Sequence, residues 1–120
     1  MHIQNIETAD CNILNTEILP NEVSIYFESV YDLEKKQHVN NVGLVITDWS
    51  DFAAKVYVSN GPGGTYEEKK LSENDVEFFE YIQTISNEGN ELIIKGYSKS
   101  SGSWLEYHFL NSKYYLKEDN

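Results

Sequence analysis

Residues 81–110 read YIQTISNEGNELIIKGYSKSSGSWLEYHFL, and this stretch decides the fold class. A β-rich run over 81–86 is followed by the turn Asn-Glu-Gly-Asn at 87–90 and by a second β-rich run over 91–95. Two such runs around a glycine-containing turn are typical of a β-hairpin. After a second polar turn, apolar and polar residues alternate over 104–110. The stretch therefore predicts antiparallel strands that follow one another in a meander.

The same period of two occurs in the first half of the chain. Apolar and polar residues alternate over 23–27 and 42–46, residues 55–58 are β-rich, and residues 12–18 are expected to form an earlier strand. We predict a single, mainly β domain over 1–120, an antiparallel meander of about 7–8 short strands that forms a barrel or a two-sheet sandwich. The apolar phase of the strands predicts a core that contains Val23, Ile25, Phe27, Leu44, Ile46, Leu92, Ile94, Leu105, Tyr107 and Phe109.

Three further segments are expected to connect or extend these strands. Residues 47–52 are predicted to form a hairpin link, and residues 114–117 to add a last strand that completes the meander. Residues 60–75 are predicted to form one long polar connection, because 60–64 read Asn-Gly-Pro-Gly-Gly. This glycine-rich run is not followed by the lysine and the helix of a phosphate-binding loop, so we expect no nucleotide site there.

Residues 72–86 are ambiguous between helix and strand. Ser72 with Asp75 three positions later resembles the start of a helix. Helical spacing also fits the apolar residues Phe78, Tyr81, Ile82 and Ile85. The turn at 87–90 favours a strand instead. We predict at most one short helix near 72–80, followed by a strand, and one longer helix over the segment is the alternative.

Charge is the most informative bulk property of the chain. Twenty acidic residues and nine basic residues give a formal net charge of -11, and all nine basic residues are lysines. Nucleic acids and anionic membranes bind basic surfaces, so both are disfavoured as partners. The chain has one cysteine, no signal-like start and no apolar run of about 20 residues, so we expect a cytoplasmic protein.

The sequence offers no residue pattern typical of catalysis or of metal binding. The three histidines are isolated from one another and from Cys11, which is expected to be a small, buried residue. Trp104, Glu106 and His108 alternate along one strand and should share one face. That face suits a binding or acid–base patch, or simply the amphipathic outer face of a sheet. We predict no enzymatic activity, no cofactor and no metal.

Taken whole, the chain resembles the small acidic immunity proteins encoded beside bacterial contact-dependent or polymorphic toxins. Its size, its lysine-only charge balance, its β-meander and the Trp-x-Glu motif within 96–107 carry the resemblance. The resemblance implies tight, non-covalent binding of a cognate toxin domain, often a basic nuclease. We therefore expect a non-enzymatic inhibitor of a basic protein, and the alternative is a small β-barrel that binds a small apolar ligand.

Two acidic and aromatic segments are the expected contacts with the partner, because carboxylates steer a basic partner and aromatic side chains anchor interfaces. The predicted partner-binding residues are Asp48, Trp49, Asp51, Glu67, Glu68, Glu73, Asp75, Glu77, Phe78 and Tyr81. Trp49 is equally expected to close one end of the barrel as part of the core.

Overall fold

The computed structural model describes residues 2–118, and β-strands dominate this range. The strands are β1 (Ile6–Glu7), β2 (Ile13–Leu19), β3 (Glu22–Asp32), β4 (Gln37–Thr47), β5 (Asp51–Ser59), β6 (Tyr66–Leu71), β7 (Phe79–Glu88), β8 (Glu91–Ser98), β9 (Trp104–Leu110) and β10 (Lys113–Glu118). One 3-10 helix, η1 (Ile3–Asn5), precedes them. The predicted mainly β fold is confirmed, with ten strands in the described range. No helix within 2–118 is long and apolar enough to cross a membrane.

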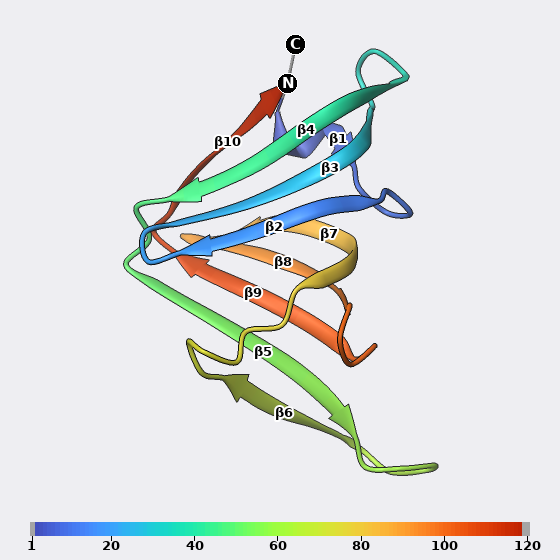
Figure 1. Ribbon diagram of the computed structural model, residues 1–120, viewed down its shortest axis with the longest axis vertical. Helices are drawn as coiled ribbons and strands as arrows, with labels where there is room; N and C mark the ends of the chain where they lie inside the picture. The colour runs from blue at the N-terminus through green and yellow to red at the C-terminus, as the bar shows by residue number, and fades with distance from the viewer. Residues whose placement is uncertain (1, 119–120) are drawn as a thin grey trace.

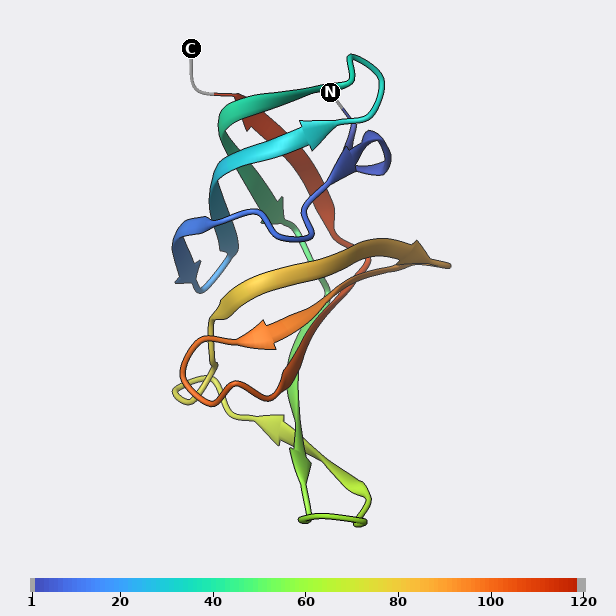
Figure 2. The same ribbon diagram turned by 90° about the vertical axis from the view of Figure 1, so that its right-hand side faces the viewer.

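The strands form two antiparallel sheets that share one core (Figures 1 and 2). The first sheet has the order β1-β3-β4-β10, and β2 pairs with the edge of β3 that also carries β1. The second sheet has the order β6-β5-β9-β8-β7. In Figure 2 the first sheet occupies the upper half of the molecule and the second sheet the lower half. The expectation of a barrel or a two-sheet sandwich is met by these two curved, facing layers.

Alternation places one apolar face of each sheet in the core. All ten predicted core residues are buried, and each is at most 1% exposed: Val23, Ile25, Phe27, Leu44, Ile46, Leu92, Ile94, Leu105, Tyr107 and Phe109. Aromatic rings fill the space between the sheets, because Phe52 stacks on Phe109 with ring centroids 4.5 Å apart and Trp49 packs against both. These rings therefore occupy part of the space between the sheets.

Strand β7 explains why residues 72–86 are ambiguous in the sequence. Its register against β8 shifts twice, once across Glu80 and once across Gln83. Each shift is a β-bulge that adds one residue to β7, so three-residue steps replace two-residue steps. The residues that face the core are accordingly Phe79, Ile82 and Ile85. Their spacing imitates that of a helix, although the backbone is a strand.

The segment between β6 and β7 forms a turn, so residues 72–80 contain no helix, and the prediction of at most one short helix followed by a strand holds. The Asp75 amide donates a hydrogen bond to the Ser72 carbonyl at 2.9 Å, and the Ser72 hydroxyl donates to the Asp75 carboxylate at 2.6 Å. The polar pair that resembles a helix start thus closes a single turn, because the strand pairing of β7 begins at Phe79 and leaves no room for a further helical turn.

The β7 bulge at Gln83 lies against Gly96 on β8. A Cβ atom at Gly96 would lie 2.0 Å from the carbonyl oxygen of Tyr81 and 2.9 Å from the Cα atom of Ile82. Real Cβ atoms do not approach backbone atoms so closely, so only glycine fits here. Gly96 therefore allows β7 to bulge while it remains paired with β8.

Two links join the sheets at one end, and at both of them the observed strand pairing differs from the predicted topology. Strand β4 pairs with β3 and β10, whereas β5 pairs with β6 and β9, so the expected hairpin at 47–52 is a crossing between sheets. Strand β10 pairs with β4, so it leaves the meander and does not complete it. The links contact each other, since the Ser50 amide donates to the Leu110 carbonyl at 2.8 Å and the Asn111 amide side chain donates to the Ser50 hydroxyl at 3.1 Å. Alternation shows which face is apolar, but it does not show which strand is the neighbour.

The predicted polar connection over 60–75 contains an additional strand. Strand β6 pairs with β5 and forms an edge of the second sheet, and only Leu71 at its end is buried. A strand that is exposed on both faces shows no apolar alternation, so its sequence resembles a loop. Strands β5 and β6 form a hairpin that extends away from the rest of the molecule (Figures 1 and 2).

Candidate functional site

The outer face of the second sheet carries four aromatic side chains in one row. Tyr57 on β5 is paired with Trp104 on β9. Trp104 is also paired with Tyr97 on β8, and Tyr97 is paired with Tyr81 on β7. Directly paired residues share a face, with Cβ atoms about 5 Å apart. We call Tyr57, Trp104, Tyr97 and Tyr81 the aromatic row; it crosses four strands, and Tyr97 and Tyr81 remain 44% and 39% exposed.

A charged row lies two residues further along the same face. Glu106 on β9 is paired with Lys55 on β5 and with Lys95 on β8. Its carboxylate accepts a hydrogen bond from the Trp104 indole at 2.9 Å and lies 2.8 Å from Nε2 of His108. Burial alone would raise the pKa of Glu106, but the bonds from His108 and Trp104 and the charge of Lys95 outweigh burial and hold the pKa below its ordinary value. Glu106 is therefore a charged group beneath the aromatic row.

His108 is held between two carboxylates on the same face. Its Nδ1 atom lies 2.6 Å from Glu91 and its Nε2 atom 2.8 Å from Glu106. An ionised carboxylate only accepts hydrogen bonds, so both contacts are complete only when both ring nitrogens carry hydrogen. The Nδ1 contact links β9 to β8, and the Nε2 contact lies within β9. The arrangement is typical of a structural bridge and not of a free general base.

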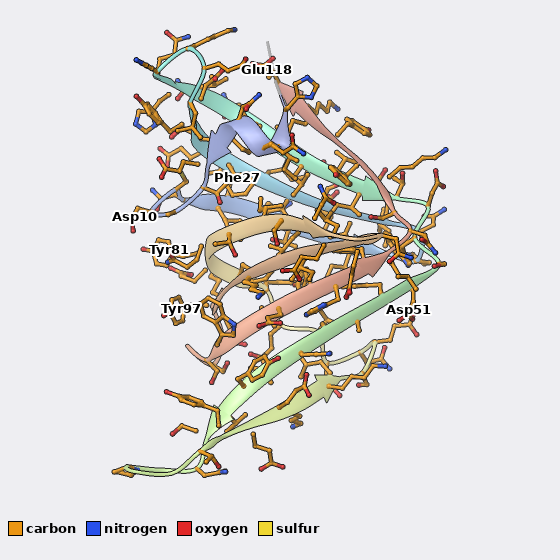
Figure 3. The ribbon with its side chains drawn as sticks, turned by 180° about the vertical axis from the view of Figure 1, so that it is seen from behind. Asp10, Phe27, Asp51, Tyr81, Tyr97 and Glu118 are labelled. Carbon is orange, nitrogen blue, oxygen red and sulfur yellow. The ribbon has the colours of Figure 1, made fainter. Side chains whose placement is uncertain are left out.

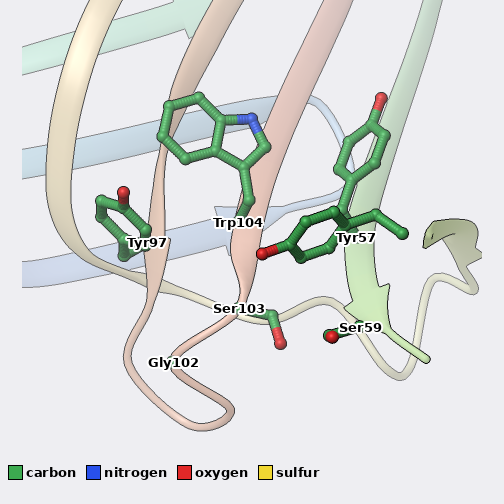
Figure 4. Close-up of a pocket in the computed structure, with 7 residues that line it drawn as sticks. Tyr57, Ser59, Tyr97, Gly102, Ser103 and Trp104 are labelled. Atoms are coloured by element: carbon green, nitrogen blue, oxygen red, sulfur yellow. The ribbon is translucent and has the colours of Figure 1, made fainter. Parts of the chain in front are cut away.

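A pocket of about 540 Å³ opens at one end of the aromatic row (Figure 4). It is lined by Tyr57, Ser59, Tyr66, Tyr97, Gly102, Ser103 and Trp104. The lining residues come from the β5–β6 hairpin on one side and from the β8–β9 turn on the other. The Tyr57 hydroxyl donates to the Glu68 carboxylate at 3.3 Å, and burial together with the charges of Glu106 and Glu68 raises the pKa of Tyr57 to about 12. Tyr57 therefore stays neutral at physiological pH.

Two of the predicted partner-binding residues, Tyr81 and Glu68, lie on this face, and a third, Glu67, lies on the opposite face of β6. Tyr81 belongs to the aromatic row and lies next to Tyr97 (Figure 3). Glu68 is paired with Tyr57 across β6 and β5, and its carboxylate lies 3.1 Å from Nζ of Lys55. Glu67 is exposed and points to the opposite side of β6, because adjacent residues of a strand alternate.

A second hollow, of about 450 Å³, brings three other predicted residues together at the far end of the second sheet. Trp49, Asp51 and Glu73 border it with residues of the first sheet. Trp49 is half-buried against Phe52 and Phe109 and so contributes to the core. Figure 3 shows Asp51 at the opposite end of the molecule from Tyr81 and Tyr97. The ten predicted residues therefore do not form one continuous surface.

Three of the remaining four predicted residues, Asp75, Glu77 and Phe78, belong to the turn before β7. Glu77 accepts hydrogen bonds from the hydroxyls of Ser98 at 2.5 Å, Ser101 at 2.6 Å and Ser100 at 3.4 Å. Burial would raise the pKa of Glu77, but these bonds lower it below its ordinary value. Glu77 thus fastens the turn to the β8–β9 loop. The exposed positions nearby are Asp75 and Phe78, and Asp48 is exposed on the crossing link.

Sequence reasoning missed most of the pocket, namely Tyr57, Tyr66 and Tyr97. Aromatic residues in the polar phase of a strand are a usable signal, and Trp104 with Glu106 and His108 was identified in this way. The row itself depends on the order β5-β9-β8-β7, which the sequence does not show.

Groups suited to metal or nucleophile chemistry are scarce. Among residues 2–118, no set of three or more His, Cys, Asp or Glu side chains is placed to hold a metal ion. Cys11 is buried, and burial raises the pKa of its thiol.

Comparisons with protein-family models, with curated proteins and with solved structures gave no match. The function of the chain is therefore inferred from its own residues.

Proposed function

We propose that this protein is a non-enzymatic inhibitor that binds a basic protein through the outer face of its second sheet. The aromatic row carries the proposal. Tyrosine and tryptophan supply large, rigid contact area and are the side chains most enriched at the energetic centres of interfaces. Because the row crosses four strands, it offers a larger contact area than a single cross-strand pair. An exposed aromatic surface of this kind suits a protein partner.

Charge defines the kind of partner. The net charge is -11, and the carboxylates of Glu68, Glu91 and Glu106 lie on the face that carries the aromatic row. Acidic groups attract a basic surface during the diffusional encounter and disfavour acidic partners. The proposed partner is therefore basic.

A toxin domain is the basic partner that we propose. The resemblance to acidic immunity proteins supports this choice, because such proteins occlude toxins that are often basic nucleases. The alternative, a barrel that encloses a small apolar ligand, has less support because the rings of Trp49, Phe52 and Phe109 occupy part of the space that such a ligand would need between the sheets.

Co-expression with the protein encoded immediately upstream tests the proposal. We expect the two proteins to copurify and the cells to survive expression of the upstream protein. Raising the salt concentration should lower the association rate and leave the dissociation rate nearly unchanged, because screening acts on the encounter. An upstream protein that is toxic yet neither bound nor neutralised would exclude this function.

A further inference from the structure

We propose that the pocket at the end of the aromatic row accepts an arginine side chain of the partner protein. This inference rests on the proposed function and specifies its central contact. The pocket is about 540 Å³, which is roomy enough for a guanidinium group and part of its aliphatic stem. Four of its lining residues are aromatic: Tyr57, Tyr66, Tyr97 and Trp104.

The rings form walls at different angles. The rings of Tyr97 and Trp104 are 5.2 Å apart between centroids and nearly perpendicular, at 84°. Tyr57 follows on the other side of Trp104, so the three side chains succeed one another across β8, β9 and β5 (Figure 4). At this separation the two rings contact each other directly, so a bound group would lie beside the pair and not between its rings. A cation within about 6 Å of a ring centroid is attracted by the negative face of the ring.

Carboxylates behind the rings strengthen this attraction. The Trp104 indole donates to Glu106 at 2.9 Å, and the Tyr57 hydroxyl donates to Glu68 at 3.3 Å. Each bond places negative charge at the polar end of a ring, while no lysine lies among the residues that line the pocket. The nearest positive group on β5, Lys55, is itself paired with Glu68 at 3.1 Å. Lys95 on β8 is likewise paired with Glu106, so the two lysines offset part of the carboxylate charge, and the aromatic faces of the lining favour a cation over an anion.

Arginine fits these walls better than lysine does. A guanidinium group is planar, stacks on aromatic faces and is more weakly hydrated than an ammonium group. Its N–H groups need acceptors, and the hydroxyl oxygens of Ser59 and Ser103 are in the lining. The chain itself contains no arginine, since all nine basic residues are lysines. The arginine must therefore come from another protein and not from a second copy.

Nuclear magnetic resonance on the full chain tests the inference with N-acetyl-argininamide as the probe. The neutral isostere N-acetyl-citrullinamide is the matched control ligand. We expect the indole N–H signal of Trp104 to shift saturably with the arginine probe, and the citrulline probe to bind about tenfold more weakly, because it lacks the charge. The signal of Trp49, which lies against the core, should stay in place.

Two variants complete the test. Tyr97→Leu keeps apolar area in the pocket but removes the aromatic face, so it should weaken binding of the arginine probe about fivefold or more. Tyr115→Leu changes a tyrosine on the first sheet that is 54% exposed, against 44% for Tyr97, and should leave probe binding unchanged. Equal or tighter binding of the citrulline probe, of N-acetyl-lysinamide or of methyl glucoside would overturn the arginine assignment. So would a Tyr97→Leu chain that remains folded and binds the arginine probe as the parent does.

Failure of this inference differs from failure of the proposed function. If the upstream protein binds and Tyr97→Leu leaves its affinity unchanged, the pocket does not take an arginine while the inhibitor function stands. If the arginine probe binds as expected and the upstream protein does not bind, the inhibitor function fails while the pocket remains a guanidinium site.

Discussion

The outer faces of the two sheets differ in what occupies their centres. On the first sheet the paired residues Ser24 and Val45 are buried, and Tyr26 lies over the paired Gly43. On the second sheet the central positions carry long aromatic and charged side chains. Both inner faces contribute apolar residues to the one core, so this difference lies in the outer faces. A sheet needs one apolar face to fold, which leaves the other face free to carry binding residues.

The largest expected effect is a difference in stability between alanine variants of two glycines, one on each sheet. Gly96→Ala should destabilise the fold by about 3 kcal/mol, because its Cβ atom would meet backbone atoms of β7 that cannot move without losing the bulge. Gly43→Ala should cost about 1 kcal/mol or less, because its Cβ atom would meet only the ring of Tyr26, 3.0 Å away, which can shift. Urea denaturation of both variants measures the difference in the free energy of unfolding. Similar losses for the two would mean that β7 does not bulge against Gly96.

The inner faces could be predicted from the sequence because burial imposes a period of two. Every residue expected in the core from this pattern is buried, from Val23 to Phe109. The same pattern could not be recognised in strand β7, because two bulges change the spacing of its core-facing residues from two to three. Strand β6 was not predicted, because both of its faces are exposed as far as Leu71 and its sequence therefore shows no apolar alternation. The two crossings between sheets were missed because a turn sequence does not reveal which strand lies beside it.

The candidate site was less predictable for a related reason. Trp104, Glu106 and His108 lie on one strand, so their common face followed from alternation alone. Tyr57, Tyr97 and Tyr81 come from three other strands, and they meet only because of the strand order in the second sheet. The acidic residues expected at the interface were too evenly distributed along the chain for their positions to indicate one surface.

The next effect compares two exposed tyrosines on different sheets. Tyr81 lies in the aromatic row but outside the pocket. We expect Tyr81→Ala to weaken binding of the basic partner about tenfold, or about 1.4 kcal/mol. Tyr115→Ala on β10 is the matched control and should leave affinity unchanged. Surface plasmon resonance measures both affinities. A greater loss for Tyr115→Ala would place the interface on the first sheet.

A smaller effect concerns acid sensitivity. The folded chain holds the pKa of Glu106 below its ordinary value, so this carboxylate stabilises the fold above about pH 4.5 and loses that contribution as the pH falls through the folded pKa. Glu106→Gln should therefore cost about 1 kcal/mol at pH 7 and reduce the further loss on acidification. Glu77, whose pKa is also lowered, should retain part of the acid dependence. Chemical denaturation at pH 7 and at pH 3.5 measures the change, and the exposed Glu17→Gln on the first sheet is the control. An unchanged acid dependence in Glu106→Gln would mean that its hydrogen bonds do not stabilise the charged form.

The smallest effect compares two ion pairs. Lys55 and Glu68 are 3.1 Å apart with side chains 31% and 50% exposed, whereas Lys113 and Asp48 are 3.8 Å apart with side chains 81% and 65% exposed. Solvent screening weakens both, so double-mutant cycles with alanine should give a coupling of about 0.5 kcal/mol for the first pair and none within error for the second. A coupling above about 1.5 kcal/mol for Lys55 and Glu68 would contradict this expectation, because Glu68 would then be held by Lys55 too firmly to respond to an approaching cation. A weak coupling instead lets the carboxylate turn from the lysine of its own sheet toward the arginine of a partner at little cost in stability.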